Sequence, residues 1–445
     1  MKYLFFTAAV LGILPAVIFL LCDRRWIRWT TLGLFLPLLM FDSTAINFFS
    51  HATYRGTARG MEISLIYIVA VILLITIFLL RGPFRIFPGL GSWIYLVYFL
   101  SCIPSFTNAE NCLISFFELW KMIMIYLVYL AVYTYLEYSK GDFDILLYGA
   151  AITVAFNFQA IIRQHFSGVY QVRGTFPHQN SLAMYMMMAG MLFFARYFNN
   201  REQFKSKIFF AAFVMASIAL VRTYSRGALA CYPLAGVIAV FCSLRSGLSL
   251  RKMYLICILS MIGLAGLMVF LPRVIQRFQT APEASGQTRK NLAIAALNMM
   301  KDKPLAGVGL NNWGIKINPP YTYSQHRDPK RGYSDDYKDG IVETIYLLVG
   351  AECGIPSLLL LLSWFGFHWL SSIRLMSKLR GSPYFYIPVG IFAGLTGAFL
   401  QSALEWVLKQ QINFMWMIML FAMISYLNRH CRELSGGQLS AGRAV

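Results

Sequence analysis

The sequence contains few charged residues, and acidic residues are the scarcest of these. Charged residues make up 13% of the 445 residues, with 19 acidic against 39 basic side chains, whereas hydrophobic residues make up 58% and the mean hydropathy is +0.59. A soluble domain cannot bury this much apolar surface. The composition therefore excludes an ordinary soluble protein and indicates a chain that crosses a membrane many times.

The sequence also lacks the cysteine patterns of metal sites. The eight cysteines show no metal-ligand spacing, and most lie inside apolar runs, where a thiol behaves as a small hydrophobic group. Cys102 and Cys112 are different, because they flank the segment IPSFTNAEN. An oxidising compartment would permit a disulfide between these two residues.

Long apolar runs account for most of the chain. A membrane-spanning helix needs about 20 apolar residues, and windows of this kind occur about thirteen times. They begin near residues 3, 29, 62, 91, 113, 144, 180, 207, 226, 253, 341, 384 and 411. The runs are continuous and do not alternate with polar residues, which argues against a β-barrel. We therefore predict an all-α polytopic membrane protein with about 12–13 transmembrane helices.

The net charge of +20 comes mainly from short loops between these runs. The basic loops are DRRWIRW, RGPFR, ARYFNNREQFKSK, SLRSGLSLRK, SIRLMSKLR and NRHCREL. They alternate along the chain, as loops that stay in the cytoplasm do. This distribution argues against nucleic-acid binding and places the N-terminus on the far side of the membrane.

The orientation divides the chain into four parts. Residues 1–271 contain helices 1–10, residues 272–340 form a large outer loop with amphipathic helices, residues 341–430 contain helices 11–13, and residues 431–445 form a cytoplasmic tail. The first apolar run is long and has no small-residue cleavage site, so we interpret it as a retained helix rather than a signal peptide.

The outer polar segments contain arginines that run against the charge bias. These segments are 42–61, 104–112, 163–179, 222–226, 272–340 and 405–410. Arg222 and Arg226 lie in a tight link at the bilayer boundary, where a charge must reach water or find a partner. The main outer acids are Glu62, Glu110, Glu283, Asp328, Asp335, Asp336, Asp339, Glu343 and Glu405. Because boundary arginines outnumber nearby acids, we expect an anionic ligand.

Arginine suits a phosphate ligand, because its planar guanidinium donates two parallel hydrogen bonds and keeps its proton. A cluster of arginines at the outer surface would hold a lipid diphosphate. In VRGTFPHQNSLAMYM, residues 172–186, Arg173 is placed to bind a phosphate. His178 and Asn180 follow, and they either cap the next helix or contact a sugar.

The long outer loop contains two informative stretches. SGQTRKNLAIAALNMMKDKP has apolar residues at 293, 297 and 300, which predicts an amphipathic helix. PLAGVGLNNWG follows, where Gly307 and Gly309 permit a sharp turn and close backbone approach. The aromatic residues of the loop either stack on sugar faces or form an interfacial belt. They are Trp313, Tyr321, Tyr323, Tyr333 and Tyr337.

Two glutamates lie in the apolar run that follows the loop. Glu343, at its outer end, is either stabilised by the helix macrodipole or accepts a proton from an attacking hydroxyl. Glu352 lies deeper and must pair or stay neutral.

Together these motifs resemble the O-antigen ligase and O-antigen polymerase superfamily of bacterial membrane glycosyltransferases. The similar stretches are RGTFPHQNSLAMY, YSRGAL, TRKNLAIAALNMMKDKPLAGVGLNNW and ETIYLLVGAECGIPSLL, in the family order, within residues 165–365. The N-terminal third is similar only in its hydrophobic pattern. The resemblance implies a GT-C-like fold in the bacterial inner membrane, with a large periplasmic loop and an active site that faces the periplasm.

The resemblance also implies inverting transfer of a glycan from undecaprenyl diphosphate to an acceptor hydroxyl, without cofactor, metal or nucleotide. The implied partners are this lipid-linked donor, a glycan or lipid A-core acceptor and membrane lipid, with no nucleic acid. The family's phosphate-binding arginines correspond to Arg173, Arg226 and Arg289, with Arg222 as a neighbour. We expect Glu343, Arg226 and Arg289 to be catalytic. The expected substrate-binding residues are Arg173, Arg222, His178, Asn180 and Trp313.

The chain departs from the family pattern at one position. Ligases typically have His-Asn where this chain has Glu343 and Thr344, so either Glu343 takes the role of base or the acceptor chemistry differs. The departure slightly favours a polymerase, and a lipid A-core O-antigen ligase is the alternative. A lipid-linked glycan flippase is an alternative of another class, but transporters usually carry charged or broken helices near the midplane as paired repeats. A structural assembly subunit is a third possibility, against which the boundary arginines argue.

Overall fold

The computed structural model describes residues 2–35, 45–50, 54, 56–199, 203–258, 260–261, 268, 275, 283–318, 320–324 and 340–435. Within these ranges the chain is mainly helical, and seven helices are long and apolar enough to cross a membrane. They are Leu90–Asn108, Cys112–Ser139, Phe143–Phe166, Gln179–Asn199, Arg226–Leu244, Ile345–Lys378 and Gln411–Ser435. Three shorter apolar helices are Phe6–Cys22, Leu65–Arg81 and Tyr386–Gln401. The predicted class, an all-α polytopic membrane protein, is confirmed.

Some predicted spans are not complete in the described ranges. The run that begins near residue 29 forms only the eight-residue α3 (Arg25–Leu32) in its described part. Most of the run that begins near residue 253 lies outside the described residues, as do Tyr333 and Tyr337. The last helix, α18, extends to Ser435, into the predicted tail, and the remainder of the tail also lies outside the described residues.

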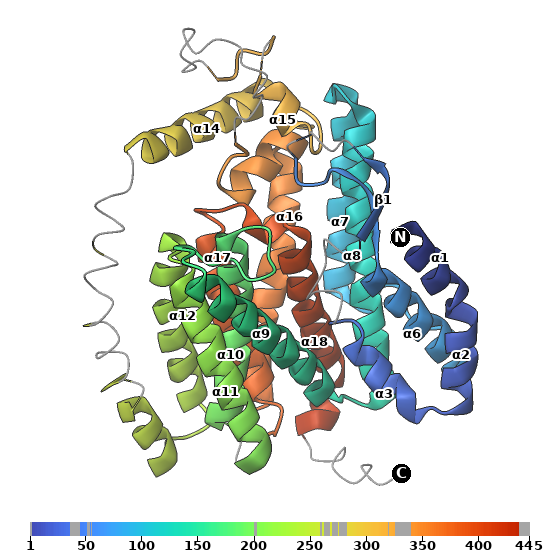
Figure 1. Ribbon diagram of the computed structural model, residues 1–445, viewed down its shortest axis with the longest axis vertical. Coiled ribbons are helices and arrows are strands. Elements are labelled where there is room, and N and C mark those ends of the chain that lie inside the picture. The colour runs from blue at the N-terminus through green and yellow to red at the C-terminus, as the bar shows by residue number, and fades with distance from the viewer. Residues whose placement is uncertain are drawn as a thin grey trace. The chain divides into compact units, whose positions relative to one another are not determined.

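The chain folds into two compact units, whose elements are shown in Figure 1. Unit 1 comprises Met1–Ser139, Glu283–His368 and Ser402–Ala422, and unit 2 comprises the remainder. Unit 1 contains α1 (Lys2–Leu11), α2 (Ile13–Cys22), α3, β1 (Ala45–Ser50), β2 (Gly60–Ser64), α6 (Leu65–Arg81), α7 (Leu90–Cys102), η1 (Ile103–Asn108), α8 (Cys112–Ser139), α14 (Glu283–Asp302), α15 (Trp313–Lys316) and η2 (Val407–Lys409). Unit 2 contains α9 (Phe143–Phe166), α10 (Gln179–Asn199), α11 (Gln203–Arg222), α12 (Arg226–Leu244) and α17 (Tyr386–Gln401). The helices α16 (Ile345–Lys378) and α18 (Gln411–Ser435) contribute to both units.

A two-stranded antiparallel sheet in unit 1 was not predicted, because residues 42–61 were interpreted only as a polar outer segment. Ala45 pairs with Ser64 and Ile46 with Ile63. Strand β2 packs against α8, where the indole N–H of Trp120 donates to the carbonyl oxygen of Glu62 at 3.0 Å. The hairpin thus packs against one of the helices that are long enough to cross a membrane.

Segments that are distant in the sequence, and that were predicted to be outer, meet in unit 1. The amide of Asn311 accepts from the backbone N–H of Thr57 at 2.8 Å and donates to the carbonyl oxygens of Ala58 and Ile114 at 2.8 and 3.0 Å. The backbone N–H of Leu310 donates to the hydroxyl of Ser105, in η1, at 3.0 Å. These contacts join residues of segments 42–61, 104–112 and 272–340.

The core of unit 2 is built around α10, which packs against α11, α12 and α17. Almost every residue of α10 from Ser181 to Ala195 is buried. Glycines on α17 permit close approach, since a Cβ atom on Gly390 would lie 2.6 Å from the Cα atom of Leu192, and one on Gly394 would lie 3.0 Å from that of Met188. Small residues that let backbones approach are typical of packed membrane helices.

The amphipathic helix expected in the long loop is α14, but its buried face differs from the predicted one. The buried residues are Leu292, Ala295, Ala296 and Met299, whereas Leu297 is 45% exposed. The amphipathic helix was predicted correctly, and Met300 packs against its buried face, but Leu297 faces outward. The disulfide that the sequence permitted does not form, since Cys102 is buried, Cys112 is exposed, and both are free thiols.

Candidate functional site

In unit 1, Arg289 binds two carboxylates that come from distant parts of the sequence. Its Nε forms an ion pair with Glu343 Oε2, and its Nη2 lies 3.3 Å from Glu405 Oε1. The side chains of Arg289 and Glu343 are each 34% exposed, whereas that of Glu405 is 9% exposed. A planar guanidinium can serve both acids at once because its donors form a rigid fork. The result is a carboxylate that is open to a ligand and held in place by a cation.

This ion triad changes one premise of the sequence analysis. Boundary arginines were expected to outnumber nearby acids, but Arg289 has two acidic partners, Glu343 and Glu405. The triad therefore carries a net charge of −1 when both acids are ionised. Arg289 is available to hold Glu343 in position, and it does not present an unopposed positive charge.

The backbone around the triad is fixed by a shared core. The N–H of Ile345, at the start of α16, donates to the carbonyl oxygen of Ser402 at 3.2 Å, so the segment with Glu343 runs beside the segment with Glu405. The buried side chains of Trp313 and Val342 pack with the apolar face of α14, and Trp406 packs against the same cluster. The three charged residues therefore extend from elements that share one apolar core.

Trp313 belongs to this core and not to the surface. Its side chain is 1% exposed, and its indole N–H donates to the carbonyl oxygen of Gly340 at 3.3 Å. In this structure no ring face of Trp313 is open to a sugar, so the expectation that it binds substrate by stacking is corrected. Its position supports the backbone that leads to Glu343.

A buried charge network joins Lys409, four residues after Glu405, to charged residues of α8 and α16. Lys409 Nζ is 3.5 Å from Glu118 Oε1 and 3.0 Å from Glu352 Oε2, and Lys121 Nζ is 2.7 Å from Glu118 Oε2. The Thr57 hydroxyl donates to Glu118 Oε2 at 2.7 Å. The side chains of the four charged residues are at most 6% exposed. The sequence analysis required Glu352 to pair or stay neutral, and its pairing is confirmed.

The charges of this network balance. Burial lowers the pKa of Lys409, but the carboxylates of Glu118 and Glu352 outweigh this effect and hold the pKa above its ordinary value. Lys409 therefore stays protonated at neutral pH. A buried ion pair is kept only where its partners satisfy each other, so these residues fix the η2 segment, and with it Glu405, against α8 and α16.

The loop that connects α14 to Trp313 rests on a break in α16. The helix is interrupted at Gly354, whose φ is 84°. The N–H groups of Val308 and Gly309 donate to the carbonyl oxygens of Ala351 and Glu352 at 2.9 and 3.0 Å. The loop therefore satisfies carbonyl groups that the interrupted helix leaves free.

The two loop glycines behave as predicted from the sequence. Gly307 and Gly309 have φ values of 66° and 118°, and a Cβ atom on Gly309 would lie 2.7 Å from the Cα atom of Ala109. A Cβ atom on Gly307 would clash with the backbone of Glu352. The sharp turn and the close backbone approach are both confirmed.

Replacing Gly307 with alanine is expected to destabilise unit 1. The left-handed backbone alone costs about 1–2 kcal/mol for a residue with a side chain, and the clash with Glu352 adds to this cost. Thermal unfolding of the detergent-solubilised protein measures the loss. Gly286→Ala is the matched control, because a Cβ atom at Gly286 meets nothing within 4 Å. Equal unfolding temperatures for the two variants would contradict the assignment.

In unit 2, the stretch that follows α9 is held by two polar side chains of that helix. Gln164 Oε1 accepts from the N–H groups of Arg173 and Gly174, each at 3.0 Å. Asn157 Oδ1 accepts from the N–H of Thr175 at 3.0 Å. The backbone of Arg173 is therefore fixed while its side chain remains exposed.

His178 takes the capping alternative in this structure, whereas Asn180 contributes only the backbone N–H that is capped. The backbone N–H of Asn180 donates to His178 Nδ1 at 3.2 Å, at the beginning of α10. Burial and the nearby guanidinium of Arg173 lower the pKa of His178. A neutral imidazole can accept this hydrogen bond, so His178 acts as a cap at neutral pH.

The tight link between α11 and α12 meets the stretch that contains Arg173. The rings of Tyr170 and Tyr224 stack with centroids 5.0 Å apart and planes 8° apart, and Arg222 Nη2 contacts His165 Nδ1. Arg226 is the first residue of α12 and is half-buried. Within the part of the chain that the structure describes, its side chain has no hydrogen bond or ion pair. The positive end of the helix macrodipole opposes a cation at a helix N-terminus. An anion bound there would interact favourably with Arg226 and with the macrodipole.

Sequence reasoning identified some of these residues and missed others. Arg289 and Glu343 were each expected to be catalytic, and the structure brings their side chains together. Glu405 was noted only as an outer acid, and its pairing with Arg289 was not predicted. The buried network was missed except for Glu352. The available signal was the pair Glu118 and Lys121, which lie inside an apolar run, because charges in such a run require partners.

One comparison with known proteins gives a match, and it covers part of the chain. Residues 211–362 match the family model described as O-antigen ligase. The match contains Arg222, Arg226, Arg289 and Glu343, whereas Arg173 precedes it. No match to a curated protein was found. The resemblance predicted from the motifs is confirmed for this part of the chain.

Proposed function

We propose that this chain, whose residues 211–362 belong to the O-antigen ligase family, transfers a glycan from undecaprenyl diphosphate to an acceptor sugar hydroxyl. In this proposal the active site faces the periplasm, and the acceptor is the growing glycan, so that the product is a polymer. The observation that carries the proposal is the ion triad, in which Arg289 holds the exposed carboxylate of Glu343 within the matched segment.

Glu343 is suited to activate the acceptor. In the proposed step, the acceptor hydroxyl attacks the anomeric carbon of the donor, its proton passes to the Glu343 carboxylate, and the bond from the anomeric carbon to the diphosphate oxygen breaks. Attack on the face opposite the leaving group inverts the anomeric configuration. A base must lie within hydrogen-bond reach of the hydroxyl, and the partial exposure of Glu343 permits this. Arg289 limits the positions that the carboxylate can take.

The arginines of unit 2 are suited to the leaving group. Two phosphate groups carry the charge that develops as the glycosidic bond breaks, and preorganised guanidinium groups stabilise such charge. Arg226 has no competing partner among the described residues, and Arg173 and Arg222 belong to segments that contact each other. We propose that these three residues bind the diphosphate.

Replacing Arg226 with alanine is expected to weaken donor binding and slow transfer. Loss of one charge-assisted contact to phosphate removes about 1.5–3 kcal/mol, or roughly a tenfold to hundredfold effect on kcat/KM. Initial rates at several concentrations of lipid-linked donor measure the change. Arg245→Ala is the control, because Arg245 is an exposed arginine at the other end of the same helix. Equal kcat/KM in the two variants would remove Arg226 from the site.

The reaction type is tested with the full chain purified in detergent. The protein is incubated with undecaprenyl-diphosphate oligosaccharide, either alone or together with lipid A core, and the products are separated by electrophoresis. Ladders from donor alone are expected. A single shifted band that requires lipid A core would identify a ligase instead. The absence of both products would contradict glycan transfer and favour transport of the lipid-linked glycan.

A further inference from the structure

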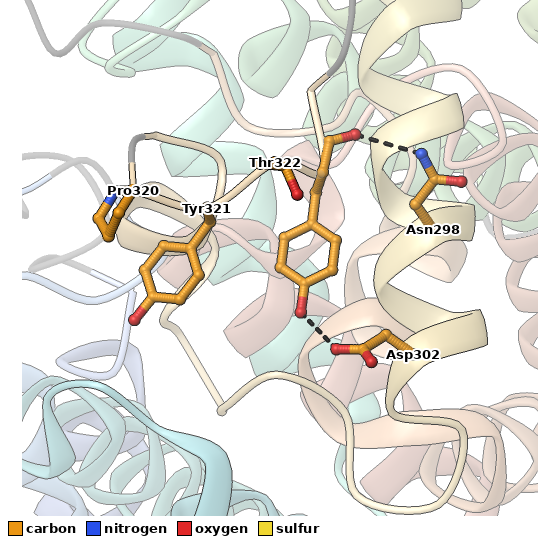
Figure 2. A pocket seen from close by; sticks show the side chains of 6 residues that line it. Asn298, Asp302, Pro320, Tyr321 and Thr322 are labelled. Carbon is orange, nitrogen blue, oxygen red and sulfur yellow. Dashed lines mark hydrogen bonds between the residues drawn. The ribbon is translucent and has the colours of Figure 1, made fainter.

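A second feature of unit 1 lies at the far end of α14. Residues of this helix and of the following loop line a pocket of about 430 Å³, a size typical of small-ligand sites. Figure 2 shows the lining residues, which are Asn298, Asp302, Pro320, Tyr321, Thr322 and Tyr323. The pocket thus combines two aromatic rings with a carboxylate, an amide and a hydroxyl.

The two tyrosine rings form an aromatic platform. Their planes differ by 12° and their centroids are 6.4 Å apart. Lys316 Nζ lies over the Tyr321 ring, 4.1 Å from its centroid. A flat apolar surface of this kind suits the C–H face of a sugar ring.

The platform is fixed before any ligand binds. The Tyr323 hydroxyl donates to Asp302 Oδ2 at 2.6 Å, and Asn298 Nδ2 donates to the carbonyl oxygen of Tyr323 at 3.2 Å. Burial and the hydrogen bond to Asp302 raise the pKa of Tyr323 to about 12, so the phenol keeps its proton. The Tyr321 hydroxyl contacts Glu110 and accepts from Lys316 Nζ at 3.0 Å. Preorganised side chains lose little conformational freedom on binding.

The charges around the pocket select the class of ligand. The Asp302 carboxylate accepts from the Tyr323 hydroxyl and would repel a phosphate, whereas Glu110, beside the Tyr321 hydroxyl, is paired with Lys316. An ionised carboxylate has about four acceptor positions, and Tyr323 occupies only one of those of Asp302. The remaining positions suit a ligand that is rich in hydroxyl donors.

We propose that this pocket binds a segment of a glycan chain, with a sugar ring against Tyr321 and Tyr323 and sugar hydroxyls donating to Asp302. The proposal rests on the proposed function in one respect, because that function makes a glycan the natural ligand. The pocket lies away from the ion triad. Asn298 is nine residues beyond Arg289, about 14 Å along the helix and on its other side. The pocket therefore holds a part of the glycan that is remote from the reacting sugar.

Binding is tested without any transfer reaction. The probe is the oligosaccharide freed from its own lipid diphosphate by mild acid, titrated by calorimetry into the full chain in detergent. Tyr321→Ala is expected to weaken binding roughly tenfold, as for loss of an aromatic contact. Tyr321→Phe is the matched variant, since it keeps the ring and removes only the hydroxyl, and most of the affinity is expected to remain.

A second variant guards against misfolding of the loop. Asp302→Asn keeps an acceptor for Tyr323 on an exposed side chain and removes the negative charge. It is expected to weaken binding with no change in thermal unfolding. Wild-type affinity in both Tyr321→Ala and Asp302→Asn would overturn the site, and so would equal loss in Tyr321→Phe and Tyr321→Ala. No binding of the probe to the unmodified chain would overturn it as well.

The outcomes separate this site from the proposed function. A chain that binds the oligosaccharide through Tyr321 but forms no product would contradict glycan transfer and leave the site in place. A chain that forms product with no measurable binding of the probe would contradict the site and leave the proposed glycan transfer in place. Where both hold, Tyr321→Ala is expected to raise KM for the acceptor and leave kcat unchanged.

Discussion

Replacing Arg289 with alanine is expected to abolish glycan transfer while the protein still inserts into the membrane. The guanidinium is the shared partner of Glu343 and Glu405, so its loss frees the carboxylate that is proposed to accept the acceptor proton. Loss of a positioned electrostatic group in an active site lowers kcat by about 100- to 1000-fold. Product formation by purified protein and glycan output in cells both measure this effect.

Companion variants separate the roles of the cation and the acid. Glu343→Gln keeps the shape of the side chain and removes the base, so it is expected to reduce transfer as strongly. Arg289→Lys keeps the positive charge but loses the fork that reaches two acids, and intermediate activity is expected. Lys290→Ala is the control, because it removes an exposed cation from the adjacent position of α14. Normal output from Arg289→Ala or Glu343→Gln would remove the triad from catalysis.

Replacing Lys409 with methionine is expected to cause the largest loss of stability. The change leaves Glu118 and Glu352 buried with only Lys121 to oppose them. Removing one partner of a buried ion pair typically costs about 3–5 kcal/mol, because the other charge remains uncompensated. Thermal unfolding in detergent, followed by tryptophan fluorescence, measures the loss. Lys303→Met is the control, since Lys303 is exposed.

A double variant tests whether the charges act as one network. Lys409→Met with Glu352→Leu removes a cation and an anion together and leaves the pair of Glu118 and Lys121. The double variant is therefore expected to be more stable than Lys409→Met alone, a coupling that a mutant cycle reveals. Additive losses would show that the residues do not depend on one another, and would refute the network.

Helices were the most predictable part of this fold. Apolar runs begin within a few residues of the observed helices, as at Leu90, Cys112 and Gln179. Periodicity also located α14, but it could not fix the buried face, since Leu297 is as apolar as Leu292 and only the packing partner decides between them. Burial of Trp313 had the same cause, because composition does not reveal which aromatic residues meet a core.

The site was predictable only where one residue type demands a partner. Glu352 inside an apolar run required a partner, and it has one in Lys409. Arg289 and Glu343 were expected to be catalytic, but the sequence did not specify an ion pair between them. The second acid, Glu405, is separated from Arg289 by more than a hundred residues, and no local pattern connects them. The hairpin of β1 and β2 was not predicted for a similar reason, because the pairing of its strands depends on contacts with α8 that a single sequence does not display.

The interruption of α16 at Gly354 also has an electrostatic consequence. Peptide dipoles along the first part of the helix sum to a partial negative charge at its end, where the carbonyl groups of Ala351 and Glu352 lie. Lys409 is therefore paired with the carboxylate of Glu352, which lies on the turn that forms this negative pole. An uninterrupted helix would carry its pole several turns further away, and the lysine would lose that part of its stabilisation.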